Sequence, residues 1–181
     1  MMAMLTPRSA AVIQRPTAPV RLTPVIAPQL TQVYLHPGHL HASAEPSAIT
    51  TVLGSCVAVC LFDARIRAGG VNHFLLPDHT HDAAVAGRYG PSATQQLLDR
   101  MFALGARAET MTARLVGGAN VLAAIRVTPS LGERNAASAI EVLLAAGVLV
   151  SARDVGGEVG RKLVFSTRDG TAWIKPLGGA R

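Results

Sequence analysis

The feature that most limits what this chain can fold into is an apolar stretch, rich in β-branched residues, from Thr51 to Phe62. Such a stretch predicts a buried strand. Gly69-Gly70 follows, and then a second apolar run from Val71 to Leu76, which Pro77 ends. Hydrophobic residues make up 49% of the chain and aromatic residues only 4%. Aliphatic side chains and alanine must therefore fill a core built around strands.

The rest of the sequence predicts two helices among further strands. Ser92 to Leu104 has the apolar spacing of a helix, with Pro91 suited to its first turn and Gly105 to the position beyond its end. Asn135 can cap a second helix that runs through Ala146. Further strands are expected at 112–116, 148–154, 162–167 and 171–175. This order favours an α+β fold with helices packed on a sheet.

The length of 181 residues suits one domain, which we place at residues 31–181. Residues 1–30 carry five prolines, three arginines and no acidic residue, so a disordered N-terminal tail is expected there. The longest apolar run, from Val142 to Val150, is too short to span a membrane. No signal-peptide core is visible, and two reduced cysteines fit a cytoplasmic protein.

The net charge is +6, from 17 basic and 11 acidic residues. The basic residues are not interleaved with aromatic ones as in proteins that stack single-stranded bases, so nucleic-acid binding is not expected. The positive charge either serves an acidic protein partner or reflects a bias toward arginine.

Cys56 is the main candidate for chemistry. Most free cysteines are small buried hydrophobic residues, but this one directly follows Gly54-Ser55 at the mouth of an apolar run. Backbone N–H groups there could stabilise an oxyanion. His73 is either a core histidine or the base that activates the thiol. Thr50 is either an ordinary strand residue or the group that orients the imidazole.

Other polar motifs favour structural roles. Cys60 lies deeper in the apolar run and is assigned to the core. Two groups of histidines, His36, His39 and His41 and then His79 and His81, lack the spacing of a zinc site and are interpreted as loop residues. Residues 156–162 lack the phosphate-loop pattern and predict a turn between strands. No metal and no cofactor is expected.

Six motifs occur in a characteristic order: Leu53-Gly54-Ser55-Cys56-Val57-Ala58-Val59, Asn72-His73-Phe74-Leu75-Leu76-Pro77, Arg88-Tyr89-Gly90, Gly117-Gly118-Ala119, Gly132-Glu133-Arg134-Asn135 and Asp154-Val155-Gly156-Gly157-Glu158-Val159-Gly160-Arg161. The series, from about residue 31 to 175, resembles the CheD family of chemoreceptor glutamine deamidases. Val116, before the Gly-Gly-Ala motif, and Asn120-Val121, after it, depart from the family pattern.

The resemblance implies a fold and an activity. The fold would be a layered α/β/β core with a mixed sheet and two main helices, similar to deamidating bacterial toxins. The activity would be hydrolysis of receptor glutamines to glutamates, with a possible methylesterase activity on the same receptors. The family's catalytic residues fall on Cys56, His73 and Thr50, with Gly54 and Ser55 in the oxyanion loop.

The expected partners are a chemoreceptor cytoplasmic domain and, in many members of the family, a CheC-type phosphatase that competes with it. We expect a monomer that is not embedded in a membrane. Two other readings stay open from the sequence. One is a non-enzymatic regulator that binds the phosphatase or the receptor, and the other is a thiol peptidase or general cysteine hydrolase.

Overall fold

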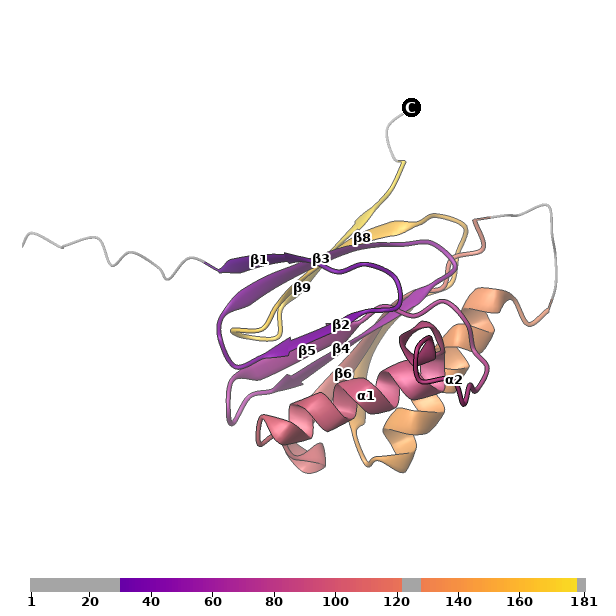
Figure 1. Ribbon diagram of the computed structural model, residues 1–181. Coiled ribbons are helices and arrows are strands. Elements are labelled where there is room, and N and C mark those ends of the chain that lie inside the picture. The colour runs from indigo at the N-terminus through magenta and orange to yellow at the C-terminus, as the bar shows by residue number, and fades with distance from the viewer. Residues whose placement is uncertain (1–29, 122–127, 179–181) are drawn as a thin grey trace, which may run out of the picture.

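The computed structural model describes residues 30–121 and 128–178, and it shows three layers (Figure 1). A four-stranded outer sheet has the order β1-β3-β8-β9, and a five-stranded central sheet has the order β2-β5-β4-β6-β7. Two helices cover the free face of the central sheet. The layered α+β fold expected from the sequence is thereby confirmed, and the likeness to deamidating toxins stays a prediction.

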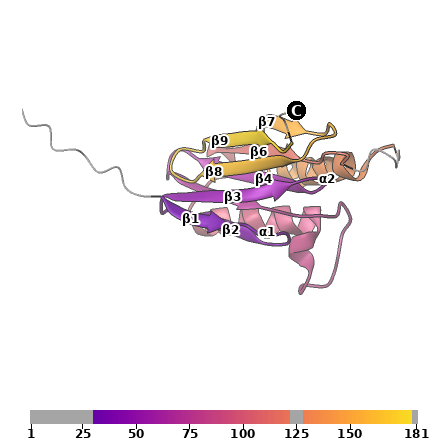
Figure 2. The same cartoon turned by 90° about the horizontal axis from the view of Figure 1, so that it is seen from above.

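The outer sheet is formed by segments from both ends of the described chain. In Figure 2 its strands follow one another across the molecule. β1 and β3 pair in parallel, whereas β3 with β8 and β8 with β9 are antiparallel. The bounds are β1 Thr31–Tyr34, β3 Ser47–Leu53, β8 Arg161–Ser166 and β9 Ala172–Pro176.

The central sheet is antiparallel except where β6 and β7 pair in parallel, with α2 in the connection between them. The strands are β2 Leu40–Ser43, β4 Val57–Asp63, β5 Ala68–Asn72, β6 Met111–Gly117 and β7 Leu149–Val155. The helices are α1 Gly90–Ala103 and α2 Leu131–Ala145, with short 3-10 turns η1 Ala86–Arg88 and η2 Ala108–Thr110.

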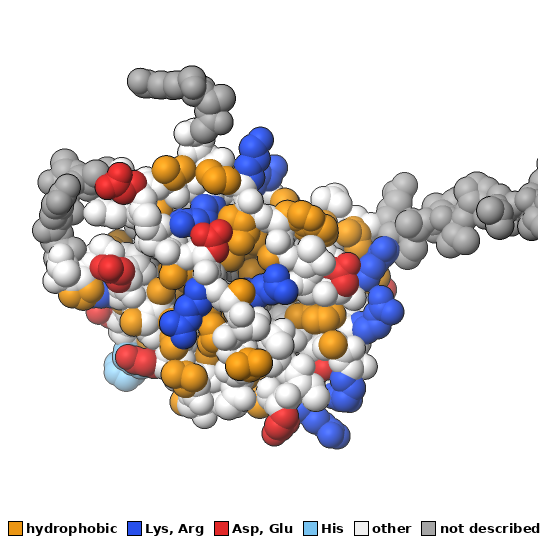
Figure 3. Space-filling model, turned by 180° about the vertical axis from the view of Figure 1, so that it is seen from behind, with side chains coloured by type: hydrophobic (Ala, Val, Ile, Leu, Met, Phe, Trp, Pro, Cys, Tyr) orange, Lys and Arg blue, Asp and Glu red, His pale blue; other side chains and the backbone are white. Residues whose placement is uncertain are grey.

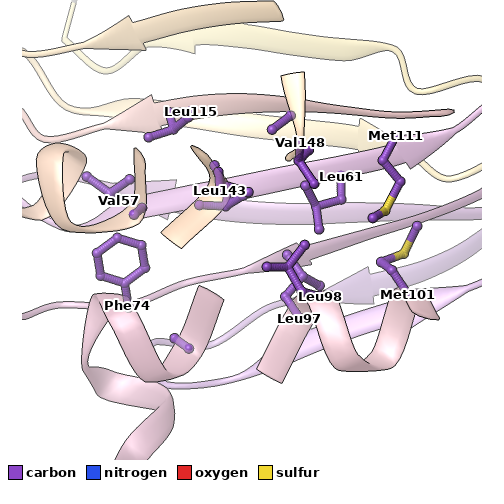
Figure 4. Close-up of a cluster of buried hydrophobic side chains, with 14 of the residues drawn as sticks. Val57, Leu61, Phe74, Leu97, Leu98, Met101, Met111, Leu115, Leu143 and Val148 are labelled. Carbon is purple, nitrogen blue, oxygen red and sulfur yellow. The ribbon is translucent and has the colours of Figure 1, made fainter. Parts of the chain in front are cut away.

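Strand β4 is apolar on both faces because it lies in the middle layer. Val57, Val59 and Leu61 belong to a cluster that packs against the helices (Figure 4). Ala58 and Cys60 belong to a second cluster, between the two sheets. Burial on both faces explains why the sequence of this strand reads as a continuous apolar run without alternation.

Most predicted elements are confirmed to within a few residues, with three corrections. The single strand expected at 51–62 is two strands, β3 and β4, which belong to different sheets. Helix α2 begins at Leu131, where Ser130 and Glu133 form a capping box, so Asn135 lies inside the helix and does not cap it. Strand β5 ends at Asn72, so the run to Leu76 is only partly strand.

Two short strands, β1 and β2, were not predicted. β1 begins at Thr31, where the folded domain was expected to start. The tail predicted over 1–30 lies outside the described residues, apart from Leu30.

Candidate functional site

The segment Gly54-Ser55-Cys56 crosses from the outer sheet to the central sheet, between the end of β3 and the start of β4. Cys56 is half-buried and packs against the cluster between the sheets. The next residue, Val57, exchanges two backbone hydrogen bonds with Phe74, at 3.1 and 3.0 Å. Cys56 and His73 are therefore diagonal neighbours across this pair.

Both side chains lie on the same side of the central sheet. Val57 and Phe74 belong to the helix-facing cluster, so the flanking Cys56 and His73 project toward the outer sheet, as strand alternation requires. Diagonal neighbours are about 7–8 Å apart at Cα, which is within reach of long side chains. The fold thus places the thiol and the imidazole that the sequence singled out as diagonal neighbours on one face of the central sheet.

Thr51 orients the imidazole. Its Oγ1 lies 2.9 Å from His73 Nδ1 and donates a hydrogen bond of 2.8 Å to the backbone carbonyl of Leu35. A threonine hydroxyl has one proton, so at Nδ1 it must accept. We therefore assign the proton to Nδ1. His73 Nε2 is left with its lone pair, and it has no hydrogen-bond partner among the described residues.

The structure gives to Thr51 the contact that the sequence assigned to Thr50. Ile49, Thr51 and Leu53 are buried in β3 and face the central sheet, whereas Val52 is 42% exposed. Thr50 points to the same outward face as Val52, because side chains two residues apart in a strand lie on the same face. A shift of one residue along β3 therefore separates the hydroxyl that can reach His73 from the one that cannot.

Burial controls the charge of both candidate groups. It lowers the pKa of His73 to about 4, although the backbone carbonyl of Leu35 opposes this. Burial also raises the pKa of the Cys56 thiol, which backbone hydrogen bonds at Gly54 and Cys56 offset only in part. At neutral pH the pair is a neutral thiol beside a neutral imidazole whose Nε2 is free to accept a proton.

The connection between β1 and β2 holds the backbone of His73 on both sides. The N–H of His73 donates to the carbonyl of His39 at 3.0 Å, and the N–H of Gly38 donates to the carbonyl of His73 at 2.6 Å. His36 and His39 lie in this connection, with ring centroids 6.3 Å apart. These two hydrogen bonds hold the His73 backbone against the β1–β2 connection, and the Thr51–Leu35 hydrogen bond holds the hydroxyl that contacts its imidazole.

The Gly-Gly-Ala motif holds the Cys56 segment in place. The N–H of Gly118 donates to the carbonyl of Cys56, and that of Ala119 donates to the carbonyl of Gly54, both at 2.8 Å. Gly117 has φ +114°, and a Cβ there would collide with the carbonyl oxygen of Cys56. This glycine allows β6 to pass directly against the segment that carries the thiol.

The turn predicted over residues 156–162 is confirmed for residues 156–160, which connect β7 to β8, whereas Arg161 and Lys162 begin β8. Arg161 stabilises it, with Nε 2.9 Å from Asp154 Oδ1 and Nη2 2.8 Å from the carbonyl of Gly156. The carbonyl of Gly157 accepts from the N–H of Asn120 at 2.7 Å. This turn therefore supports the residues that follow the Gly-Gly-Ala motif.

The remaining polar candidates lie outside this site. Cys60 is 1% exposed, and burial raises the pKa of its thiol to about 12, which fits the core role expected for it. No group of three His, Cys, Asp or Glu side chains that could hold a metal ion is found among residues 30–121 and 128–178. Within the same residues, no helix is long and apolar enough to cross a membrane.

Sequence reasoning missed two residues of the site. Thr51 was passed over for its neighbour, although the alternation of β3 distinguishes the two. Asn135 was interpreted as a helix cap, but its Nδ2 donates to the carbonyls of Ser55 and Leu75, at 3.1 and 2.9 Å. The motif Gly132-Glu133-Arg134-Asn135 was the available signal for it.

A thiol, an imidazole and a hydroxyl on a layered α/β/β scaffold are the parts used by thiol-dependent acyl-transfer enzymes. Comparison with known proteins gives the family. A family model described as CheD chemotactic sensory transduction matches residues 75–176, and the chain belongs to the CheD family. The matched residues begin just after His73 and include the last four of the six motifs.

Individual relatives cover most of the chain. A probable chemoreceptor glutamine deamidase CheD 1 of Anaeromyxobacter dehalogenans is 48% identical over 81% of this chain and 85% of its own. A probable chemoreceptor glutamine deamidase CheD of Trichlorobacter lovleyi is 43% identical over 80% and 90%. One of the same description from Methanococcus maripaludis is 36% identical over 76% and 90%.

Proposed function

We propose that this chain hydrolyses the side-chain amides of chemoreceptor glutamines to glutamates, with Cys56 as nucleophile and His73 as base. The observation that carries the proposal is the state of His73. Its Nδ1 proton is engaged by Thr51, and its Nε2 is unpartnered on the side of the sheet where Cys56 lies. The printed descriptions of the relatives supply the substrate class.

The first half-reaction forms a thioester. His73 Nε2 takes the thiol proton, and the sulfur attacks the carboxamide carbon of the glutamine. Backbone N–H groups of the Gly54-Ser55-Cys56 segment stabilise the oxyanion that forms. The imidazolium then returns the proton to the nitrogen, the C–N bond breaks, and ammonia leaves.

The second half-reaction releases glutamate. Water replaces ammonia beside His73, which accepts one of its protons as the oxygen attacks the thioester carbon. The C–S bond breaks, the thiol is restored, and the product is a carboxylate. General acid–base catalysis of this kind contributes about 10²–10⁴-fold to the rate. The Thr51 hydroxyl keeps Nε2 unprotonated until it accepts a proton from the thiol or from water, and it stabilises the imidazolium that results.

The family resemblance adds finer proposals. A methyl ester of a receptor glutamate meets the same thiol with methanol as leaving group, so methylesterase activity is proposed as a second outcome of one chemistry. A CheC-type phosphatase is the proposed competitor for the receptor surface. A cytoplasmic monomer is the proposed working form.

The test is mass spectrometry of a purified receptor cytoplasmic domain after incubation with the protein. Glutamine-to-glutamate conversion that is lost in Cys56→Ala and kept in the matched Cys60→Ala variant supports the proposal. Conversion by Cys56→Ala would refute Cys56 as nucleophile. Binding without conversion favours the non-enzymatic regulator, and backbone cleavage favours the peptidase. A methyl-esterified receptor in parallel reports methanol release.

A further inference from the structure

One side chain of the helical layer joins the Cys56 segment to the His73 segment. Asn135 belongs to α2, is fully buried, and donates through Nδ2 to the carbonyls of Ser55 and Leu75, at 3.1 and 2.9 Å. The first carbonyl immediately precedes Cys56. The second lies two residues beyond His73, just past the Val57–Phe74 pair. A single carboxamide thus spans both halves of the candidate site.

The orientation of this carboxamide is determined by its partners. A backbone carbonyl only accepts, so the nitrogen of Asn135, and not its oxygen, must face both Ser55 and Leu75. In a trans peptide the C=O and the following N–H point in opposite directions. A Ser55 carbonyl directed at α2 therefore turns the N–H of Cys56 away from the helices and toward the side of the sheet where His73 lies.

Asparagine at this position is not explained by stability alone. Its Oδ1 is buried and has no hydrogen-bond partner among the described residues, and an unsatisfied buried acceptor lowers stability. Asparagine also forms helices less readily than alanine, and the neighbouring Ala136 and Ala139 pack normally in the same helix. Local costs of this kind are expected where a residue serves function.

We propose that Asn135 is a positioning residue that holds the Ser55–Cys56 peptide plane, so that the N–H of Cys56 faces the developing oxyanion. This inference rests on the proposed function for the reaction that it serves. It acts through Cys56 and does not touch the substrate. The hydrogen bond to Leu75 ties the same carboxamide to the strand segment that carries His73, so the thiol and the imidazole keep one relative position.

Two variants test the proposal. Asn135→Asp has nearly the same shape, but an ionised carboxylate cannot donate to either carbonyl. Asn135→Ala removes both hydrogen bonds without adding charge. The control is Leu143→Ala in the same helix. Leu143 is fully buried in the helix-facing cluster. Its truncation leaves a cavity and lowers stability, but it removes no hydrogen bond to the Cys56 segment.

Two readouts separate positioning from a loss of stability, each measured where urea denaturation shows the variant to be folded. For the receptor domain, we expect both Asn135 variants to lower kcat about 10²-fold, since small misplacements of reacting groups have effects of that size. KM should change by less than about twofold. The pH dependence of Cys56 alkylation by iodoacetamide should move to higher pH in Asn135→Ala, because a backbone donor to the thiolate is no longer fixed.

Leu143→Ala should keep the parent kcat and the parent alkylation profile despite its lower stability. The proposal is overturned if the Asn135 variants keep kcat within about threefold of the parent, or if Leu143→Ala loses as much activity as they do. An unchanged alkylation profile in Asn135→Ala also overturns it. Because alkylation needs no receptor, this measurement tests Asn135 even if Cys56→Ala proves active and the proposed function fails.

Discussion

Replacing Thr51 by valine removes one hydroxyl without changing the shape of the side chain. The hydroxyl accepts from His73 Nδ1 and donates to the carbonyl of Leu35. In Thr51→Val the buried carbonyl loses this donor, and the Nδ1–H loses its acceptor. An unsatisfied buried polar group costs about 1–3 kcal/mol, so the free energy of unfolding should fall by about that amount or somewhat more.

The effect on activity should exceed the effect on folding. Without the Thr51 hydroxyl only the Leu35 carbonyl still favours the tautomer that leaves Nε2 unprotonated, and the imidazolium loses one of its two acceptors. General-base catalysis contributes about 10²–10⁴-fold, and we expect kcat to fall into the lower part of that range. The measurement is the rate of glutamine-to-glutamate conversion in a receptor cytoplasmic domain, followed by mass spectrometry at a pH where urea denaturation shows the variant to be folded.

The matched control is Thr50→Val. This change removes the same hydroxyl one residue earlier, on the outward side of β3, where Thr50 is in register with Tyr34 and Val164. It should leave kcat within about twofold of the parent. If Thr50→Val inactivates the protein and Thr51→Val does not, then the strand alternation is wrong as a guide to the site, and the assignment of the Nδ1 proton fails with it.

Three further predictions concern stability, backbone packing and charge. The pKa of a histidine is near 6.5 in the unfolded chain, whereas burial lowers that of folded His73 to about 4. The unfolded state therefore binds more protons between these pH values, and about 3 kcal/mol of stability should be lost as pH falls through that window. Urea denaturation of the parent and of His73→Asn measures this loss, and equal pH dependence in both would contradict the assignment. Gly117→Ala should destabilise the protein by about 1–3 kcal/mol or more and lower kcat, because residue 117 has a positive φ and a Cβ there would collide with the Cys56 carbonyl. Thermal denaturation and the conversion assay check this. Gly105→Ala is the control, because residue 105 also has a positive φ but has open space around it. Receptor binding should weaken as salt rises, because the net charge is +6, several basic side chains lie on the face shown in Figure 3, and exposed charges are screened over about 10 Å at 0.1 M. Binding that is independent of salt in a titration would count against a role for this net charge.

The sequence predicted local elements well and the arrangement of layers less well. Periodicity and turn residues located both helices and most of the strands, because these signals are local. The break within 51–62 was missed because β3 and β4 are both buried, and their residues alone do not reveal that Gly54-Ser55-Cys56 passes between two sheets. The resemblance supplied the layers that periodicity could not.

For the candidate site, the sequence singled out Cys56 and His73, and the fold places them on neighbouring segments of the central sheet. It proposed Thr50 as the third group, whereas the hydroxyl that contacts His73 is that of Thr51. The burial of Ile49 and Leu53 shows that Thr51, and not Thr50, faces the central sheet. This burial depends on the second sheet, which the sequence does not reveal. The motif 132–135 drew attention to Asn135, but it did not reveal the two carbonyls that this side chain contacts, which are separated from it by 80 and 60 residues.

Glycines of three of the six motifs allow close approaches of the backbone. Gly117 lets β6 pass close to the Cys56 carbonyl. Gly118 and Gly132 let the start of α2 approach the Gly-Gly-Ala motif, because a Cβ on either glycine would meet the backbone of the other. Gly90 packs at the start of α1 with no room for a Cβ beside Ser138 and Phe74. Each close approach brings a separate element against the chain around Cys56 or His73. A cysteine on a crossing between sheets lacks the regular ladder that holds a strand residue, so its position depends on these contacts. Substitutions at these glycines should therefore alter catalysis before they unfold the protein.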